Sequence, residues 1–346
     1  MSTLLELFGF ILLVIETLTG MVGNGFIAII NFIDWFSSRK LSPADMILSC
    51  LSLFRFAFHA IGIQNAILLL FFRDIFQMKN VHLAYSALWL FVNTANLWFA
   101  ALLSVLYCVK IANFSHPLFL QMKRRFPGLV PWLLLGTVVF SAIITTIKVI
   151  MGNRLMSECK TFESLLSNNT DSGMKTSDFC KHSILLYVVP DFLPFMIFLF
   201  SSIFLLTSLW RHKNLLQNST RDVSTEVHLN AINALASFSI LYVSSFFVER
   251  MSVFFSWNGM QGIGMELLLT NVVVAYSSGH AIILIVINPK LKQESVKMLR
   301  QLKCSMKLPG PYGNGILIWK NNTVVPRVTD ASGYRRFRLQ TPLTQK

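Results

Sequence analysis

The sequence predicts an all-α membrane protein, a bundle of seven membrane-spanning helices followed by a short amphipathic helix. The chain of 346 residues is 54% hydrophobic and only 13% charged, and its mean hydropathy of +0.58 is too high for a soluble protein with an ordinary polar surface. Seven apolar stretches reach the length, about 18 residues or more, that a helix needs to cross a bilayer. The last stretch passes directly into a basic, helix-prone segment.

The apolar stretches define the expected helices in order. We place them at residues 7–33, 43–71, 82–110, 129–150, 183–210, 229–256 and 265–287. The first lacks a preceding basic region and a following cleavage site, so we expect it to stay in the mature chain. The loops are short apart from residues 152–182. We therefore expect one domain over residues 1–303 and a disordered cytoplasmic tail over residues 304–346.

The net charge of +14 is distributed as membrane orientation requires, which argues against a nucleic-acid partner. With the N-terminus outside, nine basic residues before the tail lie on inner loops and six on outer loops. The inner set is Arg39, Lys40, Lys110, Lys123, Arg124, Arg125, Arg211, Lys213 and Arg221, and the outer set is Arg73, Lys79, Arg154, Lys160, Lys175 and Lys181. Inner basic residues also attract the headgroups of acidic membrane lipids.

The longest outer loop carries features of an extracellular segment. Asn168 begins an Asn-Asn-Thr sequon and is the expected glycosylation site. Similar sequons at Asn113, Asn218 and Asn321 fall on the inner side, where no glycan is expected. Cys159 and Cys180 share the outer loop, and the sequence leaves open whether they form a disulfide or stay unpaired.

One charged residue, Arg55, lies too deep in its span to reach a headgroup. A charge in hydrocarbon needs a partner or a wet cavity. We expect a structural role, in which the guanidinium joins three spans by hydrogen bonds to Asn24 and to Ser277 or Ser278. A buried polar contact of this kind has bonded and broken states that a ligand can bias.

A candidate ligand pocket is expected in the outer half of the bundle. Trp89, Asn93 and Asn96 follow each other by four and three residues, so they share one helical face. An aromatic ring beside amides suits amphiphilic small molecules; the alternative is an interfacial tryptophan with amide bonds between helices. Three polar residues of later spans are expected to complete the pocket, namely Asp191, Tyr242 and Thr270.

Other polar residues of the spans give no sign of catalysis. Glu249 and Arg250 are interpreted as a local surface pair, and His59, His82 and His280 as isolated residues. No hydrolase, nucleotide-binding or metal-ligand motif is present. We expect neither an enzyme nor a cofactor.

Several segments, in order and spacing, resemble the bitter taste receptor (type 2 taste receptor) family of G-protein-coupled receptors. They include Gly23-Asn24-Gly25-Phe26-Ile27, Leu106-Tyr107-Cys108-Val109-Lys110, Leu193-Pro194-Phe195 and Ile287-Asn288-Pro289-Lys290-Leu291-Lys292. The resemblance covers about residues 5 to 303. Ala281 stands where the family usually has Ser or Pro, so that one hydrogen bond to Arg55 is either absent or supplied by Ser277 or Ser278.

The resemblance implies a multi-pass plasma-membrane receptor that binds bitter organic compounds and activates a gustducin-type heterotrimeric G protein. It places Trp89 and Asn93 in the ligand pocket and Tyr242 near a switch residue. The expected switch set is Asn24, Arg55, Ser278 and His280. The expected G-protein-contacting set is Lys110, His116, Arg211, His228, Lys290 and Lys292.

Two other functions remain as alternatives. A pheromone receptor like the vomeronasal type 1 receptors would share the architecture, but Lys110-Ile111-Ala112-Asn113 favours taste. A small-molecule transporter would require paired charges along a path and usually repeated halves, and no halves repeat here. Whether the receptor forms a homo-oligomer is left open.

Overall fold

The computed structural model describes residues 2–76, 78–111, 117–166, 172–217, 222–257, 262–306, 317–320 and 323–326. The helices are α1 (Ser2–Ser38), α2 (Pro43–Phe71), α3 (Arg73–Phe76), α4 (Lys79–Ile111), α5 (Pro117–Leu166), α6 (Ser172–Gln217), α7 (Asp222–Trp257), α8 (Ile263–Ile287) and α9 (Pro289–Met306). Seven of these helices are long and apolar enough to span a membrane, each at a predicted position. The predicted seven-helix bundle, with a helix after the last span, is confirmed.

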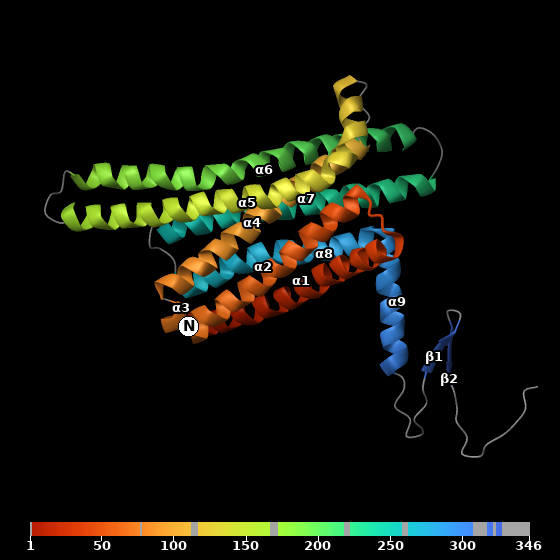
Figure 1. The fold of residues 1–346 in the computed structure, drawn as a ribbon, viewed down its shortest axis with the longest axis horizontal. Coiled ribbons are helices and arrows are strands. Elements are labelled where there is room, and N and C mark those ends of the chain that lie inside the picture. Colours follow the sequence, from red (N-terminus) through yellow and green to blue (C-terminus); the bar gives the residue numbers. More distant parts are fainter. Residues whose placement is uncertain are drawn as a thin grey trace, which may run out of the picture. The chain divides into compact units, whose positions relative to one another are not determined.

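The long helices of the unit Met1–Ser295 lie side by side (Figure 1). Helix α1 packs against α2 and α8, α4 packs against α2, α5 and α6, and α7 packs against α6 and α8. Apolar side chains fill these contacts, for example Phe99 between α2 and α5, and Phe198 between α4 and α7. Many large apolar side chains remain exposed on the bundle, as expected where lipid is the solvent.

Gly20 allows a close approach between α1, α2 and α8. A Cβ atom at this position would lie 2.1 Å from Nε2 of His59 and 2.6 Å from Oγ of Ser278. Both side chains are buried. They occupy the space that any larger residue would need, so glycine sets the spacing of the three helices.

The prediction of a long outer loop over residues 152–182 is wrong, because most of these residues are helical. Helix α5 continues to Leu166 and α6 begins at Ser172, so most of the segment is helical. Hydropathy marks where the hydrocarbon ends, whereas a helix can continue into water when residues such as Leu, Met, Glu and Lys favour it. The predicted glycosylation site Asn168 lies outside the described residues.

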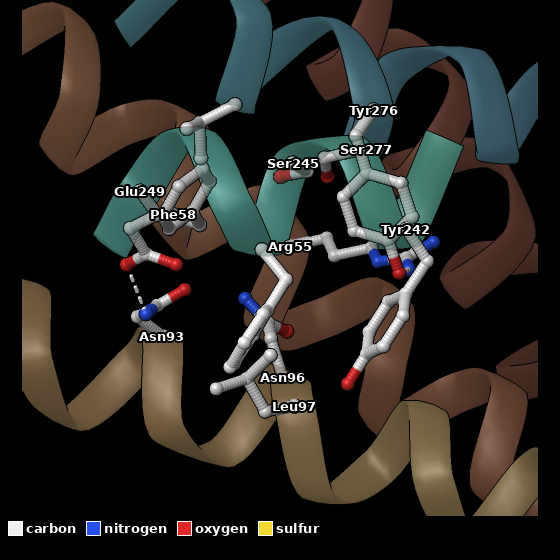
Figure 2. Close-up of a pocket in the computed structure, with 12 residues that line it drawn as sticks. Arg55, Phe58, Asn93, Asn96, Leu97, Tyr242, Ser245, Glu249, Tyr276 and Ser277 are labelled. Atoms are coloured by element: carbon white, nitrogen blue, oxygen red, sulfur yellow. Dashed lines mark hydrogen bonds between the residues drawn. The ribbon is translucent and has the colours of Figure 1, made fainter. Parts of the chain in front are cut away.

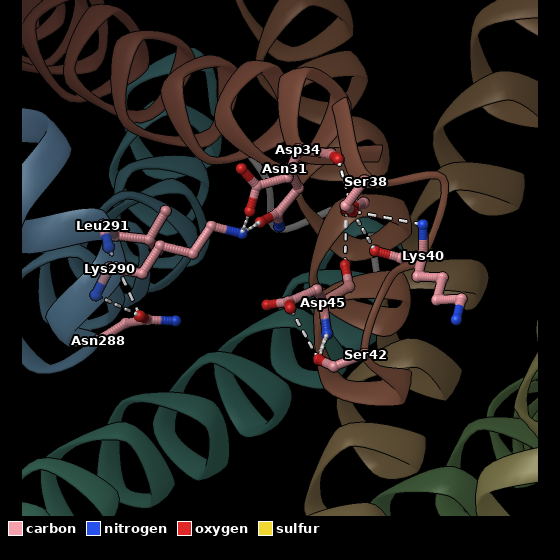
Figure 3. Close-up of polar contacts among 10 residues, drawn as sticks. Asn31, Asp34, Ser38, Lys40, Ser42, Asp45, Asn288, Lys290 and Leu291 are labelled. Carbon is pink, nitrogen blue, oxygen red and sulfur yellow. Dashed lines mark hydrogen bonds and ion pairs between the residues drawn. The ribbon is translucent and has the colours of Figure 1, made fainter. Parts of the chain in front are cut away.

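Local sequence signals determine where helices begin and end at one end of the bundle (Figure 3). This end contains Ser42 and the α8–α9 junction at Asn288, and we call it the α9 end. Ser42 caps α2 by accepting a hydrogen bond from the backbone N–H of Asp45 at 3.1 Å, and Pro43 occupies the first turn. At the α8–α9 junction, Asn288 Oδ1 accepts a hydrogen bond from the N–H of Lys290 at 3.1 Å. The Lys290 ammonium donates to Oδ1 of Asn31 at 3.0 Å and pairs with Asp34, which joins α9 to α1.

A second compact unit comprises Val296–Lys346. Within it, beyond the end of α9, the described residues form two short strands, β1 (Leu317–Lys320) and β2 (Thr323–Pro326). They pair antiparallel, with Ile318 opposite Val325. The disorder expected for the rest of the tail stays a prediction.

Candidate functional site

A small cavity lies among α2, α4, α7 and α8 (Figure 2). Its volume is about 30 Å³. The lining residues are Arg55, Phe58, Asn93, Asn96, Leu97, Tyr242, Ser245, Phe246, Glu249, Val273, Tyr276 and Ser277. Apolar rings and aliphatic side chains thus alternate with amides, hydroxyls and two charged groups, so the wall can accommodate an amphiphilic molecule.

The structure brings three of the predicted ligand-binding residues together in this cavity: Asn93, Asn96 and Tyr242. Asn93 and Asn96 come from one face of α4, as their spacing predicted. Figure 2 shows Asn93 facing Glu249, and the Asn93 amide donates a hydrogen bond to Oε1 of that carboxylate. Tyr242 is fully buried, stacks on Phe195 of α6 and packs against the tilted ring of Phe198 of α6.

The other three predicted ligand-binding residues do not line the cavity. Trp89 packs on Phe58, one of the lining residues, with ring centroids 4.4 Å apart. Thr270 is half-buried on α8, away from the lining set. Asp191 is buried in an ionic contact instead. The packing of Trp89 on the Phe58 ring was not predicted.

A buried ionic network joins α5, α6 and α7. The Lys148 ammonium donates two hydrogen bonds to the Asp191 carboxylate, at 2.6 and 2.7 Å. Arg250 pairs with the same carboxylate and with Oε2 of Glu249, the latter at 3.0 Å. The Lys148 and Asp191 side chains are each 3% exposed, and those of Arg250 and Glu249 are 11% and 12% exposed.

This network corrects the interpretation of Glu249 and Arg250 as a local surface pair. Both side chains face neighbouring helices, where Asp191 pairs with Arg250 and the Asn93 amide donates to Glu249, as buried charges require. The sequence analysis also missed Lys148. A lone lysine inside the apolar stretch 129–150 is a detectable signal, since a charge within a span marks a partner or a function.

Arg55 is held by α8, through residues other than those predicted. Its guanidinium donates to the Tyr276 hydroxyl at 2.5 Å and contacts Nδ1 of His280, and it lies 4.9 Å from the centre of the Tyr276 ring. Tyr276 and His280 are one helical turn apart and therefore present one face to Arg55. His280 also stacks on Phe238 of α7, so its interpretation as an isolated residue was wrong.

The predicted partners of Arg55 bond elsewhere. Asn24 donates to the backbone carbonyl of Gly20 at 2.9 Å, within its own helix. Ser278 donates to the backbone carbonyl of Glu16 at 2.8 Å, joining α8 to α1. Ser277 lines the cavity, and its hydroxyl has no hydrogen-bond partner among the described residues. Ser278 therefore joins two helices, whereas Asn24 bonds within its own helix, and neither is a described hydrogen-bond partner of the guanidinium.

Comparison with known proteins identifies this arrangement. The sequence model of the family described as taste receptor protein (TAS2R) matches residues 1–303. The chain belongs to the type 2 taste receptor family. It is 33% identical to taste receptor type 2 member 8 of Pongo pygmaeus over 300 residues, which cover 85% of this chain and 95% of that relative. It is also 33% identical to taste receptor type 2 member 2 of Homo sapiens over 294 residues, covering 82% and 93%.

The fold of this taste receptor is that of a G-protein-coupled receptor. It is similar to squid rhodopsin with a TM-score of 0.58 and 12% identity, over 89% of each chain. The likeness concerns the fold alone. Family and fold together establish a multi-pass membrane protein of the bitter-taste receptor class, and not an enzyme.

Of the residues expected to contact a G protein, Lys110, Arg211, Lys290 and Lys292 lie toward the α9 end of the taste receptor. Lys110, Arg211 and Lys292 are exposed there. Lys290 is engaged by Asn31 and Asp34. His116 lies outside the described residues, and so does the side chain of His228, on α7.

Proposed function

We propose that this chain is a plasma-membrane receptor, with its N-terminus extracellular, that binds bitter organic compounds in the α2–α4–α7–α8 cavity and activates a gustducin-type heterotrimeric G protein. Family membership supports the ligand class. The bias of basic residues toward loops on one side supports the orientation. The single observation that carries the binding site is the convergence of Asn93, Asn96 and Tyr242 in one cavity with apolar walls.

The size of the cavity specifies how an agonist would act. Sites for organic ligands usually enclose roughly 300–1,000 Å³, whereas this cavity encloses about 30 Å³. An agonist therefore binds a conformation in which α4, α7 and α8 leave more space, and it favours that conformation only to the extent that it binds it better. The Asn93–Glu249 hydrogen bond between α4 and α7 is the contact that such an opening changes first.

The proposed route to the G protein runs along α7 and α8. Tyr242 of α7 packs against Tyr276 of α8 in the cavity wall, and Phe238 of α7 packs against His280 of α8 one turn further along each helix. A wider cavity would displace α7. The end of α7 that lies near the exposed Lys110 and Arg211 side chains would then move. That movement would open the surface that admits a G protein.

The proposal is tested by expressing the chain with a chimeric G protein and measuring calcium release to a broad panel of bitter compounds. An N-terminal epitope tag, detected on intact cells, reports surface display and orientation together. We expect calcium responses to a subset of the panel. A well-displayed receptor that is silent to the whole panel would contradict the ligand class, and a tag detected only after permeabilisation would contradict the orientation.

A further inference from the structure

Arg55 carries a buried positive charge that no carboxylate compensates in the described part of the chain. Its side chain is 1% exposed. Its polar partners are a phenol and an imidazole, those of Tyr276 and His280. No carboxylate oxygen of the described residues is within 4.0 Å of the guanidinium, and its Nε–H, also buried, has no described partner. An uncompensated charge in a dry interior costs several kcal/mol.

The other charges beside the cavity compensate each other. Lys148 pairs with Asp191, and Arg250 pairs with both Asp191 and Glu249. Neither described carboxylate of this network pairs with Arg55. Figure 2 shows Glu249 beside Asn93 and the Arg55 guanidinium beside Tyr276 and Tyr242, at different sides of the cavity. The side near Arg55 is therefore electropositive.

That side of the cavity also offers hydrogen-bond donors. The buried Ser277 hydroxyl lines it without a described partner, and Asn96 contributes an amide. A volume of about 30 Å³ accommodates one particle of roughly the size of a water molecule. The cavity is too small for an organic acid, whose carboxylate would have to enter together with the rest of the molecule. A water molecule would fit but would leave the charge uncompensated.

We propose that this part of the cavity binds one small inorganic monovalent anion, such as chloride, held by the Arg55 guanidinium and the Ser277 hydroxyl. The anion supplies the negative charge that no described carboxylate provides within 4.0 Å of Arg55. It would bind next to the agonist and independently of it. The receptor would then be stabilised by halide in the absence of any bitter compound.

The test is a thermal unfolding series on the purified, agonist-free receptor. Sodium chloride replaces sodium gluconate at constant ionic strength, because gluconate is too large for the cavity. We expect the unfolding midpoint to rise with chloride and to saturate. Arg55→Gln is expected to abolish the rise. Ser277→Ala is expected to raise the half-saturating chloride concentration about tenfold, since one hydrogen bond to a charged ligand is lost.

Ser104→Ala is the matched control. Ser104 is also a buried serine, but its hydroxyl bonds to Ser201 and Ser202 between α4 and α6 and does not line the cavity. It is expected to keep the chloride dependence of the unaltered receptor. If Arg55→Gln does not fold, the comparison of Ser277→Ala with Ser104→Ala decides whether chloride binds in the cavity. Equal midpoints in chloride and gluconate, or equal chloride dependence of Ser277→Ala and Ser104→Ala, would overturn the proposal.

Discussion

The Lys148 ammonium of α5 donates hydrogen bonds to both carboxylate oxygens of Asp191 on α6, at 2.6 and 2.7 Å, in a place where both side chains are shielded from solvent. Arg250 of α7 shares that carboxylate. Asp191 of α6 is therefore the common acceptor for donors from α5 and α7. It holds α7 beside the cavity through Arg250, which also pairs with Glu249, the acceptor of the Asn93 amide of α4.

Removing the Asp191 charge should destabilise the receptor strongly. Asp191→Asn leaves two buried cations with one carboxylate between them, and breaking a buried pair costs about 3–5 kcal/mol. The unfolding midpoint of the purified receptor should fall accordingly. The double variant Lys148→Met with Asp191→Leu removes both charges and should recover much of the loss. Asp34→Asn, in a pair whose side chains are 30% and 48% exposed, is the control and should cost under about 1 kcal/mol.

Glycine at position 20 should be required for the packing of α1. Gly20→Ala places a methyl group against the buried His59 ring and the Ser278 hydroxyl. Overpacking of this kind costs about 1–3 kcal/mol, which thermal unfolding and surface display should both detect. Gly136→Ala meets no atom within 4 Å and should be neutral or slightly stabilising, because alanine favours a helix more than glycine does. Equal behaviour of the two variants would refute the close approach.

The Tyr276 hydroxyl should contribute to holding Arg55. Tyr276→Phe removes this acceptor and keeps the ring beneath the guanidinium, so we expect a loss of about 1–3 kcal/mol for the donor left unpaired. The unfolding midpoint of the purified protein is again the measurement. Tyr85→Phe, at a half-buried tyrosine that shares no contact with Arg55, is the comparison and should have little effect. A Tyr276→Phe midpoint equal to that of the unaltered receptor would show that His280 alone suffices.

The orientation predicts a glycan on Asn168. Asn168→Gln should increase electrophoretic mobility by the mass of one N-linked glycan, and glycosidase treatment should remove the difference. Asn321→Gln alters a sequon that we place on the cytoplasmic side and should leave mobility unchanged. A glycan on Asn321 would reverse the assigned topology.

The sequence predicted the spans because the bilayer imposes a length and a composition on each helix, and both can be seen without knowledge of packing. It also predicted the shared face of Asn93 and Asn96, which depends on helical spacing alone. The prediction could not extend to residues beyond the membrane, where α5 and α6 continue as helices.

Partners between helices were not predictable, since they depend on how each helix is rotated about its own axis. Arg55 faces Tyr276 and His280 because α8 turns that face toward α2, whereas the serines beside Tyr276 were equally plausible from the sequence. The ionic network required three helices to present Lys148, Asp191 and Arg250 at one depth. Each of these charges alone indicated a need for a partner, but none identified it.

The central claim is that an agonist acts through the cavity beside Asn93. The most direct test is the calcium concentration–response curve of an agonist in cells that express Asn93→Ala, with surface display matched to the unaltered receptor. Loss of the amide should raise the half-maximal concentration about fivefold to tenfold. The control is Asn80→Ala, at an exposed asparagine in the first turn of α4, which should leave the curve in place. Curves for Asn93→Ala that coincide with those of the unaltered receptor for every active agonist would contradict the account.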